Sequence, residues 1–211
     1  PSFWDRNSNE LQNMVRCDLV DDSFEGYKLY CQETVDNLML KHRNELPDLL
    51  VEKNLNGIGI EIGVKEGKFS DIILRKSKLQ TLVSLDAWNN ILDMQEAFKR
   101  LARRPRSVCV KAESKTGVNI FQDNFFDFIY IDANHTFKFI AEDLKNWWPK
   151  LKPGGLISGH DYQKHTHNKQ VFGVVEAVDR FVKEHQLELH VTRESKFPSW
   201  YFFKPELIPF L

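Results

Sequence analysis

Hydrophobic runs alternate with amphipathic stretches along the chain from Gly57 onward, and this alternation predicts its fold. Short apolar runs, typical of buried strands, occur at 58–63, 82–85, 108–110, 126–131, 156–159, 187–191 and 200–203. Apolar residues recur at helical spacing between them, near 69–75, 91–103, 140–151 and 174–182. Strands that alternate with helices predict a parallel sheet with right-handed crossovers.

The two terminal parts of the chain depart from the regular alternation of strands and helices. The last two strands have only a loop between them, so we expect a hairpin whose antiparallel strand lies at the sheet edge. The predicted fold class is therefore α/β, a Rossmann-like, doubly wound, mostly parallel seven-stranded sheet with an antiparallel last strand. Residues 1–56 lack strand-like runs and carry helical pieces such as Tyr27–His42. We interpret 1–56 as an N-terminal helical extension or lid, and 57–211 as one domain.

Composition narrows the class of function. The 211 residues are 42% hydrophobic and 28% charged, as in globular proteins, and the net charge is -1. A nucleic-acid binder would usually be basic, and no apolar run approaches the roughly 20 residues of a membrane helix, so we expect neither partner. The start is polar, and Cys17, Cys31 and Cys109 are too scattered for a disulfide framework or a zinc ribbon. We therefore expect a cytoplasmic protein.

Ligands of such sheets bind beyond the carboxyl ends of the strands, so polar residues there are the candidates for function. The loop after the first strand, Glu61–Gly67, has glycines at Gly63 and Gly67. Lys65 stands where a dinucleotide-binding loop has the glycine that lets the backbone approach a pyrophosphate. This loop suits a nucleoside ligand without phosphate; a purely structural turn is the alternative.

The next two strand ends could hold the rest of a nucleoside. Asp86 follows the second strand, where an acid accepts hydrogen bonds from ribose hydroxyls; a helix cap is the alternative. Trp88 could line an adenine pocket or only pack. Glu113 and Ser114 follow the third strand and could read the adenine edge or cap a short helix.

The fourth and fifth strands end in Asp132 and in His160-Asp161. Two carboxylates that converge at one sheet edge repel each other unless a cation or proton lies between them. Carboxylate oxygens suit Mg²⁺, Mn²⁺ or Ca²⁺. The sequence therefore favours a metal site at Asp132 and Asp161, completed by His160 or Asn134, over two helix caps. We interpret the polar segment Asp161–Gln170 as a loop.

Six segments occur in the order found in a known group of enzymes. The chain resembles class I S-adenosylmethionine-dependent methyltransferases, and more narrowly the small macrocin- and novobiocin-type O-methyltransferases. The resemblance covers about Gly57 to Pro205 and rests on Gly59–Gly67, Ser84–Trp88, Phe126–His135, Trp147–Gly155, Gly159–Tyr162 and Pro198–Tyr201.

This resemblance implies a role for each strand end. Glu61, Gly63 and Gly67 would surround the methionine and ribose of the cofactor, S-adenosyl-L-methionine. Asp86 would bind the ribose, while Glu113 and Ser114 would lie against adenine. The metal, Mg²⁺ in the simplest case, would be held beside the methyl donor by Asp132, Asp161 and His160. Two departures are Asn134, where relatives often have an acid, and the pair His160-Asp161, where metal-dependent relatives carry two acids or an acid and an amide.

The expected reaction is methyl transfer to a hydroxyl of a small molecule such as a sugar, an antibiotic or a phenol. His160 or His135 would take the hydroxyl proton, and Asp132 would lie close to the methyl donor. The N-terminal helices could form a homo-oligomer. Two alternatives stay open: a nicotinamide-dependent oxidoreductase on the same architecture, and a non-catalytic nucleoside-binding module.

Overall fold

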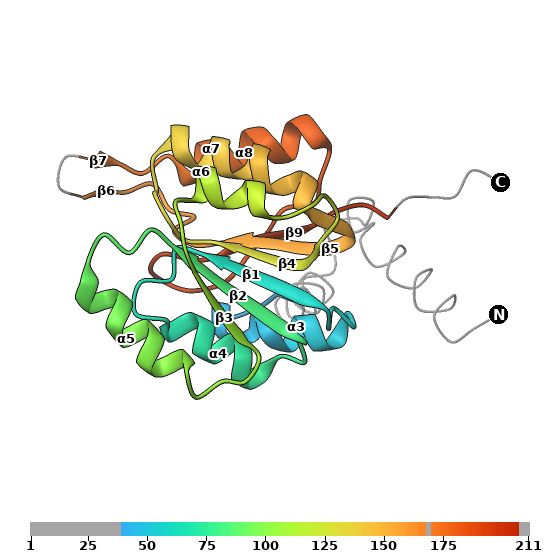
Figure 1. Cartoon of the computed structure of the whole chain (residues 1–211). Helices are drawn as coiled ribbons and strands as arrows, with labels where there is room; N and C mark the ends of the chain where they lie inside the picture. Colours follow the sequence, from blue (N-terminus) through green and yellow to red (C-terminus); the bar gives the residue numbers. More distant parts are fainter. Residues whose placement is uncertain (1–38, 168–169, 207–211) are drawn as a thin grey trace, which may run out of the picture. The chain divides into compact units, whose positions relative to one another are not determined.

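A seven-stranded sheet organises the part of the chain described by the computed structural model, residues 39–167 and 170–206 (Figure 1). Its strands lie in the order β3-β2-β1-β4-β5-β9-β8. They are β1 (Ile58–Ile62), β2 (Thr81–Asp86), β3 (Ser107–Lys111), β4 (Phe126–Ile131), β5 (Leu151–Gly159), β8 (His190–Val191) and β9 (Trp200–Phe203). Strands β1 to β5 pair in parallel, whereas β9 runs antiparallel to both neighbours. The predicted mostly parallel sheet with an antiparallel last strand is confirmed.

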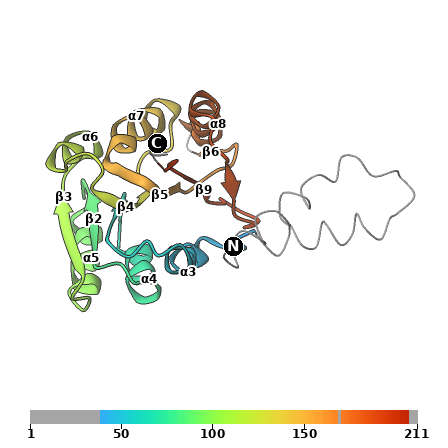
Figure 2. The same cartoon turned by 90° about the vertical axis from the view of Figure 1, so that its right-hand side faces the viewer.

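Helices cover both faces of this sheet, as Figures 1 and 2 show. One face carries α3 (Leu46–Glu52), α4 (Lys68–Lys76) and α5 (Ile91–Leu101). The other carries α6 (Ser114–Gly117), α7 (Phe137–Trp147) and α8 (Val174–His185). Three short 3-10 turns, η2 (Arg43–Glu45), η3 (Val118–Ile120) and η4 (Trp148–Lys150), adjoin α3, α6 and α7.

Side chains that alternate along the strands give each face its own hydrophobic core. On β4, Ile129 and Ile131 belong to the cluster that contains α7 and α8, whereas Phe128 and Tyr130 belong to the cluster with α3, α4 and α5. All six residues of β4 are buried, as expected for a strand covered on both faces. Glu61 lies opposite Tyr130 in the β1–β4 register and therefore points toward α4.

The C-terminal part differs in detail from the predicted elements. The antiparallel strand β9 was expected at the sheet edge but lies between β5 and β8, so the edge strand is β8. Strand β5 begins at Leu151, before the expected start, because the backbone of Gly154 and Gly155 pairs with Lys204. A small hairpin, β6 (Thr166–His167) and β7 (Gln170–Val171), forms where a loop was expected.

The N-terminal prediction falls largely outside the described residues. Within 39–56 the chain forms η2 and α3, and Leu46 and Leu50 of α3 are fully buried in the core with α4. The boundary at residue 56, the lid and the oligomer interface stay predictions. Within residues 39–167 and 170–206, none of the helices is long and apolar enough to cross a membrane.

Candidate active site

A cavity of about 790 Å³ opens beyond the carboxyl ends of β1, β2, β3 and β4. Seven carboxylates line it, namely Glu61, Glu66, Asp86, Glu113, Asp132, Glu142 and Asp143. Four lysine and arginine side chains also line it, namely Arg43, Lys65, Lys68 and Lys115, together with His135. Because acids outnumber bases, the cavity favours a ligand that carries positive charge.

The glycine at the end of β1 lets two strand ends approach each other closely. Gly63 has a φ of +90°, and a Cβ atom built there would lie 2.2 Å from the carbonyl oxygen of Asp132. Only glycine fits this position without a backbone shift. Gly67, with a φ of +72°, is the residue before α4 and lies outside the cavity lining, against Leu101 of α5.

Asp86 holds the loop after β1 in place. Its Oδ2 atom accepts hydrogen bonds from the backbone N–H groups of Val64 (2.7 Å) and Lys65 (2.8 Å), and its Oδ1 accepts one from that of Trp88 (2.6 Å). The residue that caps α5 is Asn90, so Asp86 is not the helix cap. Trp88 is buried outside the cavity lining, where its indole N–H donates to the carbonyl of Lys65 at 2.8 Å.

Glu61 is a buried acid in the wall of the cavity. Only 2% of its surface is exposed. Its carboxyl accepts a hydrogen bond from the hydroxyl of Ser70, which also lies 2.8 Å from that of Ser84. Burial raises the pKa of Glu61 to about 8, because desolvation disfavours the charged form more than the Ser70 hydrogen bond favours it. The cavity wall therefore contains an acid that is largely protonated at neutral pH.

Arg43 enters the cavity from η2, ahead of the first strand. Its Nη1 lies 3.3 Å from Oδ2 of Asp132 and 3.4 Å from the hydroxyl of Tyr130, and its guanidinium lies 4.8 Å from the ring centre of Phe69. Its backbone N–H donates to the carboxylate of Glu194 (3.2 Å), in the segment between β8 and β9. Arg43 was not predicted as a site residue, since nothing in the sequence pattern before β1 distinguishes this basic residue from its neighbours.

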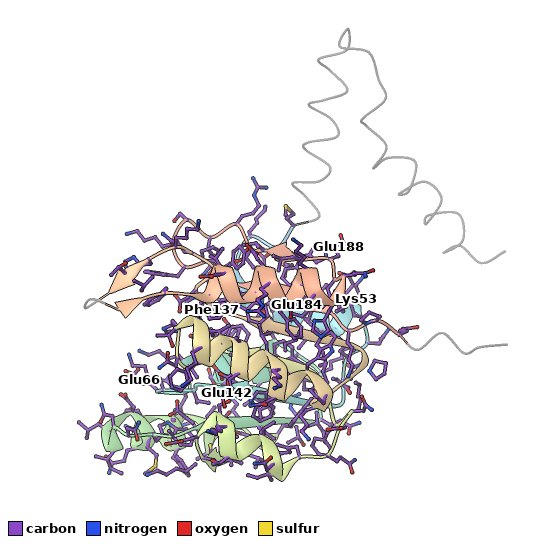
Figure 3. The ribbon with its side chains drawn as sticks, turned by 90° about the horizontal axis from the view of Figure 1, so that it is seen from above. Lys53, Glu66, Phe137, Glu142, Glu184 and Glu188 are labelled. Carbon is purple, nitrogen blue, oxygen red and sulfur yellow. The ribbon has the colours of Figure 1, made fainter. Side chains whose placement is uncertain are left out.

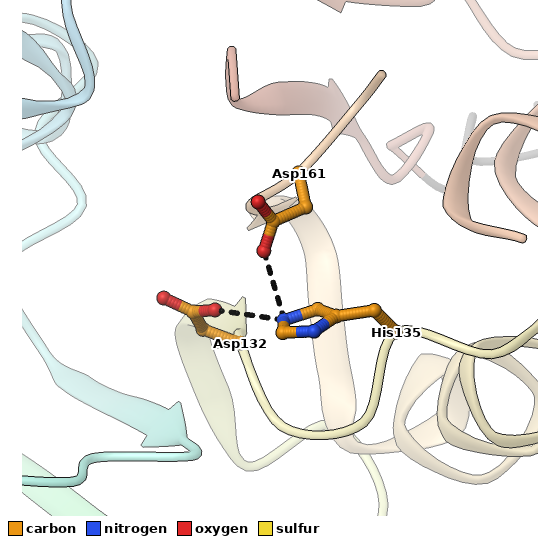
Figure 4. A group of neighbouring side chains, drawn as sticks. All are labelled: Asp132, His135 and Asp161. Atoms are coloured by element: carbon orange, nitrogen blue, oxygen red, sulfur yellow. Dashed lines mark hydrogen bonds and ion pairs between the residues drawn. The ribbon is translucent and has the colours of Figure 1, made fainter. Parts of the chain in front are cut away.

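Two acids and two histidines come together beyond the ends of β4 and β5, and Figure 4 shows three of them, Asp132, His135 and Asp161. Nε2 of His135 lies 2.8 Å from Oδ2 of Asp161 and 3.4 Å from Oδ1 of Asp132. Nδ1 of His160 lies 3.2 Å from Oδ2 of Asp161 and 3.8 Å from Oδ1 of Asp132. Asp161 follows β5 and has a φ of 59°, a sparsely populated conformation for a residue other than glycine.

Residues outside this cluster hold the ring and the backbone of His135 in place. The ring of His135 stacks on Phe172 with 4.7 Å between ring centres, and its carbonyl accepts a hydrogen bond from Gly173 N–H. Despite burial, hydrogen bonds and charge from Asp132 and Asp161 raise the pKa of His135 to about 9. The two histidines in turn hold the pKa of Asp161 well below its usual range, in spite of its burial. Three members, Asp132, His135 and Asp161, offer ligand atoms that lie within 4.8 Å of one another.

The structure brings most of the predicted site residues to this cavity. Those that line it are Glu61, Gly63, Asp86, Glu113, Ser114, Asp132 and His135. Gly67 and Trp88 support the loop after β1 instead, while His160 and Asp161 reach the cavity through their contacts with Asp132 and His135. The side chain of Asn134 is engaged within its own loop: its Oδ1 accepts hydrogen bonds from the backbone N–H and the hydroxyl of Thr136, just before α7.

A second residue that the sequence analysis missed lies at the β3 end of the cavity. Asp143 of α7 is 5% exposed and lines the cavity. It accepts a hydrogen bond from the hydroxyl of Ser114, the first residue of α6. Ser114 thus pairs with Asp143 rather than acting as the cap residue of α6, a position taken by Glu113.

Comparisons with known proteins agree with this geometry. Residues 60–162 match the sequence model of a family described as "Methyltransferase domain". A curated relative, the uncharacterized protein y4gI of Sinorhizobium fredii, is 24% identical over 89 residues, which are 42% of this chain and 9% of that protein. The chain thus matches less than a tenth of the length of this relative.

Solved structures share the fold at low identity. An O-methyltransferase from Bacillus cereus in complex with SAH is 17% identical with a TM-score of 0.57, covering 92% of this chain and 96% of that one. A SAM-dependent O-methyltransferase from Thermotoga maritima is 10% identical with a TM-score of 0.59, covering 82% and 69%. A precorrin-6y C5,15-methyltransferase from Geobacter metallireducens is 15% identical with a TM-score of 0.56, covering 76% and 88%.

At these identities the solved structures show the fold, and the family match shows the kind of domain. The matched segment runs from β1 to the loop after β5, so it includes the cavity walls from Glu61 to Asp161. Residues 60–162 thus match the methyltransferase-domain family, and the chain has the fold of a class I S-adenosylmethionine-dependent methyltransferase.

Proposed function

We propose that this protein transfers the methyl group of S-adenosylmethionine to a hydroxyl oxygen of a small molecule, with help from a divalent metal ion. The observation that carries the proposal is the convergence of Asp132, His135 and Asp161 at the edge of a cavity whose other wall contains Glu61 and Asp86. This arrangement places candidate groups for acceptor activation beside a candidate cofactor site.

The cofactor part of the proposal is supported by charge. S-adenosylmethionine carries a sulfonium and an ammonium, which suit a cavity with more acids than bases. In this proposal Glu61, in the cavity wall, holds the ammonium. Oδ1 of Asp86 accepts one hydrogen bond from the protein and keeps a lone pair for a ribose hydroxyl. A nicotinamide dinucleotide would bring a pyrophosphate into this acidic lining, so the oxidoreductase alternative is disfavoured.

The donor set suits a divalent cation. Carboxylate oxygens from Asp132 and Asp161 favour Mg²⁺ or Mn²⁺, and the imidazole of His135 extends the choice to Fe²⁺ or Zn²⁺. His160 is close enough to Asp161 to join the set. When bound, such an ion acts as a Lewis acid that acidifies and orients the acceptor hydroxyl.

The protein's own residues would position the reactants and handle the proton. In-line alignment of acceptor and sulfonium can account for roughly 7–11 kcal/mol of the barrier. His135, held by Asp161 and by the stack on Phe172, is one candidate to receive the hydroxyl proton; His160 is the other. With a pKa of about 9, His135 is protonated at neutral pH and counterbalances the two carboxylates, so it must lose that proton before acting as ligand or base.

The proposal is tested by metal removal combined with one substitution. Formation of S-adenosylhomocysteine is measured with a panel of phenolic and sugar acceptors, with Mg²⁺ or Mn²⁺ and with EDTA. We expect EDTA to abolish turnover and Asp161→Asn to lower it at least about a hundredfold, because loss of a carboxylate ligand weakens the metal and frees His135.

The control is Asp123→Asn, which neutralises an exposed acid paired with Lys150 far along the chain from the cluster. Turnover that is unaffected by EDTA but lost in Asp161→Asn would exclude a role for a metal ion. It would leave His135, held by Asp161, as the general base. Turnover unaffected by both changes would contradict any role for this cluster.

A further inference from the structure

Asp143 is a buried acid without a paired cation in the cavity wall. Among the residues that the structure describes, no lysine, arginine or histidine forms an ion pair with it, and the charged group that acts on it is the like-charged Glu142. A buried carboxylate in this situation needs hydrogen-bond donors to be stable. The protein supplies one donor, from Ser114, and the open side of the cavity has room for a second from a ligand.

Two linked hydrogen bonds determine which oxygen of this carboxyl group stays free to accept from a ligand. The indole N–H of Trp147 donates to Oγ of Ser114 at 2.8 Å. An indole nitrogen can only donate, so the Ser114 proton is committed to Oδ1 of Asp143. The remaining oxygen, Oδ2, is therefore left as a hydrogen-bond acceptor for a ligand.

The position of Asp143 relative to the strands indicates which part of a nucleoside it meets. The candidate ribose acid, Asp86, ends β2, and Ser114 follows the neighbouring strand β3. The same cavity extends from Asp86 past Ser114 to Asp143, so it has room beside β3 and α7 for the base of a nucleoside whose ribose lies at Asp86. We infer that Asp143 accepts a hydrogen bond from the exocyclic amine of adenine and thereby selects a 6-amino purine over a 6-oxo purine. This inference rests on the proposed function.

Burial raises the pKa of Asp143 but leaves the carboxyl ionised at the pH of the experiment. The raised pKa is about 6, so the carboxyl is able to accept a hydrogen bond at pH 7.5. In hypoxanthine, a carbonyl oxygen replaces the amine and would face Oδ2 of Asp143, acceptor against acceptor. A buried polar group that loses its partner in this way weakens binding about ten- to hundredfold.

The test is calorimetric titration of the full chain at pH 7.5 with S-adenosylhomocysteine and with its deaminated analogue, S-inosylhomocysteine. We expect wild-type protein to prefer the adenine compound at least about tenfold. In Asp143→Asn, the amide oxygen takes the Ser114 proton and the NH₂ group faces the base. It then repels the amine of adenine but donates to the carbonyl of hypoxanthine, so the preference should fall or reverse.

The matched control is Glu142→Gln, which removes one negative charge from the adjacent residue of α7 (Figure 3). Loss of this charge should shift both affinities alike, so the ratio between them should stay as in wild type. Equal affinity of wild-type protein for the two compounds would overturn the inference while leaving the proposed function standing; this comparison needs no variant to fold. Absence of S-adenosylhomocysteine binding would overturn both.

Discussion

At the scale of single residues, the charge of Glu61 should depend on whether a cationic ligand fills the cavity. Its pKa of about 8 in the unliganded protein exceeds the ordinary value of 4.5 because burial disfavours the carboxylate. An ammonium group beside it would favour the ionised form, so cofactor binding at neutral pH should release a proton. We predict that affinity for S-adenosylhomocysteine rises with pH between about 6 and 8, by up to roughly tenfold per unit, and then levels off.

Titrations at pH 6, 7 and 8, in two buffers with different ionisation enthalpies, measure this proton release. Glu61→Gln should weaken binding and abolish the pH dependence. Wild-type affinity that does not change across this range would show that Glu61 is ionised before the ligand arrives. The same raised pKa lowers the stability of the unliganded protein as the pH rises from about 4.5 to 8, because the folded state holds a proton that the unfolded state has lost.

Residues that directly follow an apolar strand could be identified from the sequence, and those placed by tertiary contacts could not. Asp86, Asp132 and Asp161 each stand at or just after the end of a predicted strand, and all three lie at one edge of the sheet. Arg43 precedes the first strand, and its place depends on Glu194, which is 151 residues away. Asp143 sits within an amphipathic helix, where an acid ordinarily indicates a solvent-exposed face.

At the scale of elements, the approach of β1 to β4 builds the centre of the site, and Gly63 makes it possible. We predict that Gly63→Ala lowers the free energy of unfolding by roughly 2–4 kcal/mol, because the positive φ costs about 1–2 kcal/mol and the Cβ atom also meets the carbonyl of Asp132. Chemical denaturation measures the change.

The matched variant is Gly154→Ala. Gly154 also has a positive φ, 76°, but its Cβ atom would meet only the flexible side chain of Glu206, at 3.4 Å. It carries the conformational cost without the backbone clash, so Gly63→Ala should be the more destabilising of the two. Equal losses would mean that the close approach of the strand ends does not contribute.

The sequence predicted the strands that have long apolar runs, and it did not predict the two-residue strands β6 and β7. The six-residue strand β4 is continuously buried, and its sequence alone predicted its type. Strands β6 and β7 have two residues each, too few for a periodic pattern, and their existence depends on pairing with each other. A strand was predicted at 187–191, and the structure confirms it as the shorter β8. The N-terminal part of β5 contains Pro153 and Gly154, which favour a turn, yet its backbone pairs with Lys204.

At the scale of the whole molecule, the sheet gathers acids from strands that are far apart in sequence around one cavity. Glu61, Asp86 and Asp132 come from β1, β2 and the end of β4, and Asp143 is added by α7. Seven acids line this cavity, and with Glu61 protonated and His135 charged at neutral pH the ionised acids still outnumber the cationic side chains. Its charge therefore suits a cationic nucleoside and opposes a dinucleotide with two phosphates. The central claim is therefore that the cavity is a site for S-adenosylmethionine.

Calorimetric titration of the full chain with S-adenosylhomocysteine and, separately, with NAD tests this claim most directly. The account predicts that S-adenosylhomocysteine binds with a stoichiometry of about one, that Asp86→Asn weakens it at least about tenfold, and that NAD gives no comparable signal. Two results would contradict the account: binding of NAD in preference to S-adenosylhomocysteine, or an Asp86→Asn variant that binds S-adenosylhomocysteine as tightly as wild type.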